Sequence, residues 1–394
     1  MMKRKDRDTN EKRELLFINP EMTYSGSPRS LLRMCKVAVQ LGYNVSVWSE
    51  KEGPFISEFE KNGFSVKIIS GEEADVKSTI QLIRSYDLAI CNTIMTYQFA
   101  RICCRYIPTV WYIREATNIP YFTQNNRTML YTLENSMDLY CVSNYAAHAI
   151  KKYSRHKVRV IRNCIEDESS KAVGYEVGSA EKVRFFQAGT LEYRKGLDVL
   201  LDAYERLPES YKDRSELFFA GRIFDAEIEF GNQLITRANK IKGATYLGEL
   251  VSDEIISKMS EMDIVIVPSR DESCSLVALE GAMLSKPLVV TRNVGAKYII
   301  RNKSGIVVET GDSVSLSYAM KKLIDHKCEL KSMGIRSRKN YETMANMKVY
   351  EREMKMLFDR CKDKDSFAFR IKRFRNYIVT SDKIRKLRMN LGNI

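Results

Sequence analysis

Leu15-Leu-Phe-Ile18 is followed by a loop from Pro20 to Gly26 and then by a helical pattern from Pro28 to Leu41. The four apolar residues predict a buried strand. Ser27 is a good N-cap for the helix that follows, and Gly42 suits its C-terminal end. A buried strand that leads through a loop into an amphipathic helix is the repeating unit of parallel α/β folds.

The same unit recurs over most of the chain. Further strands are expected at residues 45–48, 66–69, 88–91, 110–113 and 139–142. A second series is expected at residues 184–187, 217–220, 244–247, 264–267, 288–291 and 306–308. Helices of this second series should begin near Leu197, Asp253 (after Ser252 as N-cap), Cys274 and Val314. Two such series predict an α/β protein with two Rossmann-like, doubly wound sheets.

The charged stretch 163–181, which contains glycine and serine, interrupts the alternation and is typical of a linker. We therefore predict an N-terminal domain over residues 1–165, a C-terminal domain over residues 166–345 and a helical extension over residues 346–394. With 394 residues, the chain is long enough for two domains that each bury an apolar core.

The composition argues against several classes of protein. Apolar runs such as the one in 263–268 hold only four or five residues, whereas a membrane-spanning helix needs about 20. Charged residues follow the basic N-terminus where a secretory signal would need an apolar core, so we expect a cytoplasmic protein. Nine cysteines and three histidines lack metal-ligand spacing, and the Asp363-Lys-Asp365 triplet has no strand context. We expect no metal site.

The loop after Ile264-Val-Ile-Val267 carries the most informative chemistry. It places Glu272 and Glu280 with seven residues between them. If a helix begins near Cys274, Glu272 lies in the loop and Glu280 about two turns into the helix, so both can line one cleft. The first backbone N–H groups, from Cys274 to Val277, then form an anion-binding helix start. Two solvated glutamates are the alternative, but this arrangement favours a ligand with phosphates and hydroxyls, such as a sugar nucleotide.

Together with motifs elsewhere, this segment resembles family 4 of the retaining glycosyltransferases, whose hallmark is Glu-x7-Glu in a GT-B fold. The GT-B fold has two Rossmann-like domains that face a central cleft. The resemblance covers roughly residues 14–330. The further motifs that carry it are Gly189-Thr-Leu-Glu-Tyr-Arg-Lys-Gly196, Leu217-Phe-Phe-Ala-Gly221, Tyr246-Leu-Gly-Glu249, Pro268-Ser269, Asn163-Cys-Ile-Glu166 and Tyr24-Ser-Gly-Ser-Pro-Arg29.

The resemblance implies a role for each matching residue. Glu272 would contact hydroxyls of the transferred sugar, and Glu280 would contact the ribose. Lys195 would contact the diphosphate, with help from the amides near Ser275 and Leu276, because charge on a leaving diphosphate needs fixed cations and oriented N–H dipoles. For Lys195 the alternative is an ordinary surface lysine. The implied donor-binding set also contains Cys274, Gly189 and Gly248.

The chain departs from the family pattern in the donor loop. Thr190 stands where the family usually has arginine, so the second cation for the diphosphate must come from elsewhere. Arg194 and Arg222 are the candidates, with solvation at the surface as the alternative for each.

Two further departures concern the first domain. Arg114 occupies the place of a histidine that follows a strand in many members, and a guanidinium stays protonated and cannot act as a base. We expect Arg114 to orient a phosphate or an acceptor oxyanion, or else to form a structural ion pair. Ser27 replaces the second glycine of the Gly-rich loop, which leaves Gly26 to allow close backbone approach.

The basic C-terminal segment suggests an anionic partner. The net charge of the chain is +14, and the segment 362–394 holds ten Lys or Arg against three Asp. Phe367, Ile371, Phe374 and Ile378 form one helical stripe among these cations. Such a helix over residues 367–388 would bind an anionic membrane surface, or alternatively pack on the protein or stay disordered. No nucleic-acid motif accompanies the charge, so we expect no nucleic-acid partner.

These observations predict a retaining, metal-independent glycosyltransferase without a cofactor, which transfers a hexose or N-acetylhexosamine. The donor would be a UDP- or GDP-sugar, and the acceptor a glycan or a lipid-linked glycan of the cell surface. We expect a cytoplasmic protein that is peripheral on the inner face of the membrane if residues 367–388 bind it. The alternatives are a GT-B sugar-nucleotide epimerase and a non-catalytic glycan-binding protein.

Overall fold

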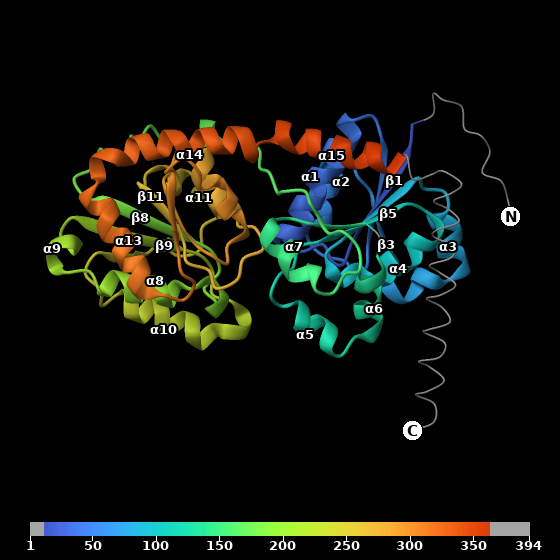
Figure 1. The fold of residues 1–394 in the computed structure, drawn as a ribbon, viewed down its shortest axis with the longest axis horizontal. Coiled ribbons are helices and arrows are strands. Elements are labelled where there is room, and N and C mark those ends of the chain that lie inside the picture. The colour runs from blue at the N-terminus through green and yellow to red at the C-terminus, as the bar shows by residue number, and fades with distance from the viewer. Residues whose placement is uncertain (1–11, 137, 363–394) are drawn as a thin grey trace, which may run out of the picture. The chain divides into compact units, whose positions relative to one another are not determined.

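The computed structural model describes residues 12–136 and 138–362, which form two compact units (Figure 1). Among these residues, the first unit contains 12–136, 138–142, 147–161 and 351–362, and the second contains 143–146 and 162–350. We expected the divisions after residues 165 and 345. Ile165 lies in the second unit because its N–H donates to the Ala345 carbonyl at 3.0 Å and its own carbonyl accepts from the Tyr341 hydroxyl at 3.1 Å.

The first unit is built on a seven-stranded parallel sheet in the order β3-β2-β1-β4-β5-β6-β7. Its strands are β1 Glu14–Asn19, β2 Asn44–Ser49, β3 Val66–Ile68, β4 Leu88–Asn92, β5 Thr109–Ile113, β6 Leu139–Cys141 and β7 Arg159–Val160. Six of them lie within one residue of the expected bounds. We did not anticipate β7, because a strand of two residues shows no periodicity. The strand order reverses between β1 and β4, as in doubly wound sheets.

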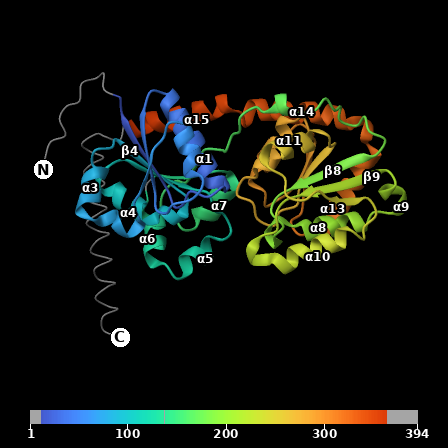
Figure 2. The same ribbon diagram turned by 180° about the vertical axis from the view of Figure 1, so that it is seen from behind.

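The helices of the first unit connect successive strands and pack on the sheet (Figures 1 and 2). They are α1 Gly26–Gln40, α2 Ile56–Lys61, α3 Lys77–Ile83, α4 Tyr97–Tyr106, α5 Ile119–Gln124, α6 Arg127–Asn135 and α7 Asn144–Lys151, the last of which crosses the division between the units. The predicted N-cap of α1 was wrong: Ser25 is the N-cap and Ser27 lies inside the first turn. Gly42 ends the helix as expected, with φ of 87°.

The second unit contains a six-stranded parallel sheet in the order β10-β9-β8-β11-β12-β13. Its strands are β8 Val183–Ala188, β9 Ser215–Ala220, β10 Ala244–Tyr246, β11 Ile264–Val267, β12 Leu288–Thr291 and β13 Gly305–Val308. All of them lie within two residues of the expected bounds. The strand order again reverses, here between β8 and β11, and ligands of open parallel sheets bind beyond the carboxyl ends at such a point.

The helices of the second unit lie on both faces of its sheet, with α8, α10 and α13 on one face and α11 and α14 on the other (Figures 1 and 2). They are α8 Leu197–Glu205, α9 Glu209–Lys212, α10 Ile228–Ala238, α11 Ser252–Ser260, α12 Leu276–Met283, α13 Ser313–Asp325 and α14 Leu330–Met344, followed by α15 Met347–Lys362. The N-cap of α11 is Val251, one residue before the expected Ser252.

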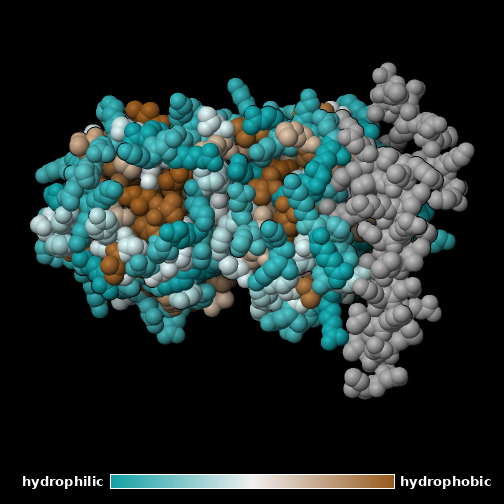
Figure 3. Space-filling view, viewed as in Figure 1, coloured by the Kyte–Doolittle hydropathy of each residue, from teal (hydrophilic) through white to brown (hydrophobic). Residues whose placement is uncertain are grey.

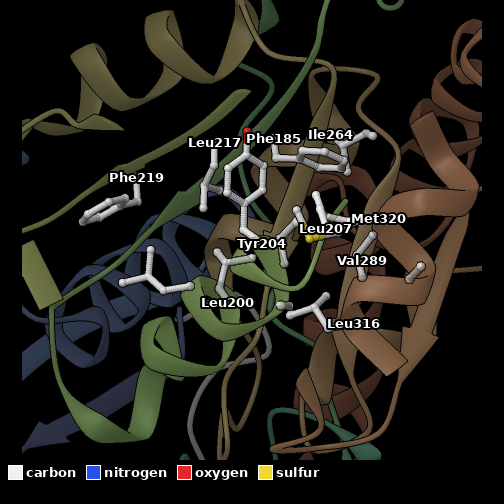
Figure 4. Close-up of a cluster of buried hydrophobic side chains, with 14 of the residues drawn as sticks. Phe185, Leu200, Tyr204, Leu207, Leu217, Phe219, Ile264, Val289, Leu316 and Met320 are labelled. Carbon is white, nitrogen blue, oxygen red and sulfur yellow. The ribbon is translucent and has the colours of Figure 1, made fainter. Parts of the chain in front are cut away.

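A buried core holds one face of the second sheet against α8 and α13 (Figure 4). Phe185 and Leu217 from neighbouring strands pack with Leu200 and Tyr204 of α8, and Met320 of α13 closes the cluster (Figure 4). Burial of each such side chain stabilises the fold by about 1.5–3 kcal/mol. This packing holds the strands whose carboxyl ends carry the candidate site.

The last helix leads back into the first unit. Helix α15 begins at Met347, and the division between the units falls within it, after Tyr350. Its Phe358 packs on Tyr43 of the first unit, with ring centroids 4.9 Å apart.

Among the described residues, no helix is both long and apolar enough to cross a bilayer. Hydrophilic residues predominate on the face of the molecule in Figure 3, with smaller hydrophobic patches between them.

Candidate functional site

Two loops meet at the carboxyl ends of β8 and β11 in the second unit. The first is the 3-10 turn Tyr193–Lys195, and the second is the segment after Val267. Gly196 joins the turn to α8 with φ of 70°, and a Cβ there would lie 2.2 Å from the Pro268 carbonyl oxygen. The N–H of Arg270 donates to the Arg194 carbonyl at 2.8 Å. Only glycine permits this approach, which fixes the turn against the loop.

This junction brings Lys195, Arg194 and Glu272 together. The Lys195 ammonium donates to Glu272 Oε2, and Arg194 Nη1 lies 3.4 Å from the same oxygen. Arg194 also donates to the Asp271 carbonyl at 2.9 Å and to the Glu192 carboxylate at 2.6 Å. The three predicted catalytic residues therefore form one contact cluster.

The charge state of Glu272 follows from its surroundings. Only 14 % of its side chain is exposed, and burial alone would raise its pKa. The positive charges of Lys195 and Arg194 outweigh burial and hold the pKa of Glu272 below its usual value. The carboxylate is therefore ionised at neutral pH in the free protein.

Arg270 holds the turn next to the cluster and was not among the predicted site residues. Its guanidinium binds both oxygens of Asp198 on α8, at 2.7 and 2.6 Å, and donates to the Tyr193 carbonyl at 2.7 Å. It also stacks on the Tyr193 ring, 3.8 Å from the centroid. A bidentate arginine–carboxylate pair is directional and locks both loops to α8. Because Asp198 is 72 positions from Arg270, no local sequence pattern predicts that the two side chains pair.

The helix start beside Glu272 lies two residues later than predicted. Helix α12 begins at Leu276, and Ser275 is its N-cap, with φ of 86° and a hydroxyl that accepts from the Ala278 N–H at 3.2 Å. The N–H groups of the N-cap Ser275 and of Leu276 and Val277 have no acceptor within the helix by its geometry. Of the four expected amides, only that of Cys274 precedes the N-cap.

A short backbone pairing holds this helix start in place. Glu272 N–H donates to the Asn293 carbonyl at 3.1 Å, Gly295 N–H donates to the Glu272 carbonyl at 2.7 Å, and Ala296 N–H donates to the Cys274 carbonyl at 2.7 Å. A Cβ on Gly295 would lie 1.9 Å from the Ser273 carbonyl oxygen. The segment that carries Glu272 is therefore fixed at both its N–H and its C=O.

The predicted donor glycines Gly189 and Gly248 follow β8 and β10, and Gly221 follows β9 between them. All three have positive φ, and a Cβ on Gly221 would lie 1.9 Å from the Gly189 carbonyl oxygen. The Gly221 N–H donates to the Gly248 carbonyl at 2.9 Å. A Cβ on Gly189 would lie 3.8 Å from the Lys195 stem, so this backbone borders the cation cluster.

Glu280 and Arg222 differ in how they relate to the cluster. Glu280 lies in the second turn of α12 and is half-buried. The Arg222 side chain is half-exposed and pairs with Asp225 three residues later, at 3.3 Å. Its contact is a local surface ion pair, whereas Arg194 contacts Glu272 directly.

The predicted acceptor-side residues gather in the first unit, where its strand order reverses. The Ser27 hydroxyl donates to Asn19 Oδ1 at 3.1 Å, and Asn92 Nδ2 donates to the Ser27 hydroxyl at 2.9 Å. Arg114 Nε donates to Asn92 Oδ1 at 2.6 Å, and its guanidinium stacks on the Tyr112 ring. Asn19 and Asn92 are fully buried. The structure therefore links Ser27 to Arg114 through the buried amide of Asn92, and Asn19 binds the same hydroxyl.

Gly26 and Glu115 are the chain neighbours of Ser27 and Arg114. A Cβ on Gly26 would meet no atom within 4 Å, and its φ is not positive, so the fold itself does not require glycine there. Glu115 accepts from the N–H groups of Ile94 and Arg114, at 2.9 and 3.0 Å. Burial nevertheless raises the pKa of Glu115 above its usual value.

The predicted membrane-binding residues 367–388 and the Asp363-Lys-Asp365 triplet lie outside the described residues.

Sequence comparison relates the second unit to a known family. Residues 176–340 match the family model for glycosyl transferases group 1. An uncharacterised glycosyltransferase of Methanocaldococcus jannaschii is 27% identical over 205 residues, which cover 52% of this chain and 54% of that protein. The O-antigen chain mannosyltransferase C of Escherichia coli is 30% identical over 166 residues, covering 41% and 42%. The chain spans about half the length of these curated relatives.

Structural comparison extends over both units. HepE of Anabaena, solved in complex with UDP, superposes with a TM-score of 0.76 at 17% identity, covering 88% of this chain and 99% of that one. A glycosyltransferase from Rickettsia africae superposes with a TM-score of 0.70 at 15% identity, covering 89% and 98%. The predicted GT-B fold is thereby confirmed, with two Rossmann-like parallel-sheet units.

Proposed function

We propose that this chain is a retaining, metal-independent glycosyltransferase that moves a sugar from a nucleotide-sugar to a glycan or lipid-linked acceptor in cell-surface polysaccharide biosynthesis. The observation that carries the proposal is the contact cluster of Lys195, Arg194 and Glu272 beside the start of α12. It lies inside the segment that matches the glycosyl transferases group 1. An O-antigen mannosyltransferase among the relatives supports the assignment to polysaccharide synthesis.

In the proposed reaction, a hydroxyl oxygen of the acceptor bonds to the anomeric carbon while the bond from that carbon to the diphosphate oxygen breaks. The leaving phosphate accepts the proton of the attacking hydroxyl, and both partners lie on the same face of the sugar. Negative charge grows on the diphosphate as the bond breaks. Lys195, Arg194 and the amides near Ser275 and Leu276 would stabilise it.

The donor is proposed to be a UDP- or GDP-sugar. HepE, the structural neighbour with the same fold, was solved with UDP and with UDP-glucose. In this chain Glu272 would bind hydroxyls of the transferred sugar, and Glu280 the ribose. Gly189 lies beside the Lys195 stem and Gly248 follows β10, and a nucleotide would need close backbone approach at both.

The acceptor is proposed to approach the first unit at Ser27 and Arg114. The guanidinium there is oriented by Asn92 and suits an acceptor oxyanion. We further propose a cytoplasmic location, with residues 367–388 binding the inner face of the membrane, since ten cations in the segment 362–394 favour an anionic surface.

The proposal is tested by incubating the full chain with UDP-, GDP- and ADP-sugars and measuring release of nucleoside diphosphate, with and without lipid-linked acceptors. A transferase releases diphosphate in stoichiometric amounts only when an acceptor is present, and EDTA should leave the rate unchanged. An epimerase would convert the donor sugar without stoichiometric release. Binding of glycans without any turnover would indicate a glycan-binding protein, and loss of rate in EDTA would contradict metal independence.

A further inference from the structure

The cations of the candidate donor site are paired with carboxylates of the protein itself. Lys195 and Arg194, which should hold the diphosphate, both contact the carboxylate of Glu272. Side-chain exposure is 20 % for Lys195 and 14 % for Glu272. Attraction between charges is stronger in such a half-buried position than in bulk water. An incoming diphosphate must therefore compete with a carboxylate that belongs to the protein.

Glu272 holds this position by its backbone. Its N–H and C=O are both bonded to the segment Asn293–Gly295, at 3.1 and 2.7 Å. Lys195 lies on the opposite loop and reaches Glu272 with a long flexible stem. Lys195 has the longer side chain and its partner starts from a fixed backbone, so we expect the lysine to move further when a diphosphate binds.

We propose that Glu272 acts as an internal counter-anion that weakens binding of the nucleoside diphosphate product relative to the intact nucleotide-sugar. This inference rests on the proposed function. With the donor bound, sugar hydroxyls donate to Glu272 and compensate its lost contact with Lys195. After transfer, the product has no sugar to offer, so the carboxylate competes with the diphosphate for the cations and promotes product release.

The test compares binding of UDP, GDP and UDP-glucose to the full-length wild type and to Glu272→Gln by isothermal titration calorimetry. One of the two diphosphates is expected to bind to wild type. Glu272→Gln should bind that diphosphate about three- to tenfold more tightly than wild type does, since one competing charge is removed. Binding of UDP-glucose should not tighten by the same factor. Glu216→Gln is the matched control, because Glu216 pairs with Arg184 near the opposite end of β9. It should bind like wild type.

The outcomes separate the inference from the proposed function. Unchanged or weaker diphosphate binding in Glu272→Gln, with normal binding to wild type, would overturn the inference alone. Absence of binding of every nucleotide to wild type would overturn both. If thermal unfolding shows that Glu272→Gln does not fold, a crystal of wild type with UDP decides. If the Lys195 ammonium contacts a phosphate of UDP and no longer contacts Glu272, the crystal supports the inference. If the Lys195–Glu272 pair is intact in the complex, the crystal contradicts it.

Discussion

The charged side chains of the candidate donor site compensate one another. Arg270 is bound by Asp198, Arg194 by Glu192, and both Lys195 and Arg194 by Glu272. The first of these pairs holds the loops together. Lys195 carries its charge on a flexible four-carbon stem, which suits it to follow a phosphate.

Lys195→Ala should keep the fold and reduce turnover about a hundredfold, because one preorganised contact to the developing charge is lost. The measurement is diphosphate release under saturating donor, with circular dichroism to establish folding. Lys258→Ala is the control, since Lys258 also pairs with a glutamate, Glu261, but near the end of α11. A wild-type rate in Lys195→Ala would remove Lys195 from the catalytic residues.

Lys286 predicts a pH dependence of stability. It is 2 % exposed, donates to the Ser260 carbonyl at 2.6 Å and lies over the Tyr175 ring. Burial lowers its pKa from 10.5 to about 8, although the charge of Asp263 opposes the shift. Between those values the unfolded chain binds more protons than the folded one, so stability rises with pH. The cost of the buried charge is complete below about pH 8 and disappears above 10.5.

Urea unfolding of wild type and Lys286→Met at several pH values from 7 to 10 measures this effect. The free energy of unfolding of wild type should increase relative to the variant as pH rises through about 8. Lys240→Met, at an exposed position, should show a constant difference from wild type. A pH-independent difference for Lys286→Met would show that burial does not suppress its charge.

Among the elements, the start of α12 depends on a neighbouring segment. The predicted start near Cys274 was two residues early because Ser275 adopts a positive φ and turns the chain before the helix. The pairing of 272–274 with 293–296 holds this turn, and the two segments are separated by helix α12 and strand β12. The sequence therefore predicted a helix here but not its first residue.

Gly295→Ala should destabilise the second unit by more than about 1 kcal/mol, because its Cβ would lie 1.9 Å from a backbone oxygen that cannot move aside. Thermal or urea unfolding measures the change. Gly26→Ala provides the comparison, since its Cβ meets nothing within 4 Å, and it should unfold like wild type. Equal stability of the two variants would mean that the backbone pairing beside α12 is not rigid.

At the scale of the whole molecule, the GT-B fold organises two sheets that each reverse their strand order. Lys195 and Glu272 meet at this point in the second unit, and Ser27 and Arg114 gather at it in the first. Gly248 follows the edge strand β10, and Arg222 pairs with Asp225. The switch point therefore locates part of the candidate site, because strand ends at a reversal leave room that helices do not fill.

Deletion of the chain after Lys362 should reduce binding to vesicles that contain anionic lipids, because it removes nine of the ten cations of the segment 362–394. Co-sedimentation with such vesicles, compared with neutral vesicles, measures the effect. Donor binding by the shortened chain serves as the control for folding. Unchanged sedimentation would discard the proposed membrane contact.

Local patterns in the sequence were sufficient for nearly all strands, for the two-sheet architecture and for the Glu272–Glu280 spacing, because periodicity and short motifs are properties of neighbouring residues. Packing alone decided the rest. Lys195 meets Glu272 across 77 positions, and Asp198 holds Arg270 across 72. Such pairs form only when separate strands align in one sheet and bring their loops to the same edge, so their geometry exists in the folded chain and in no segment of it.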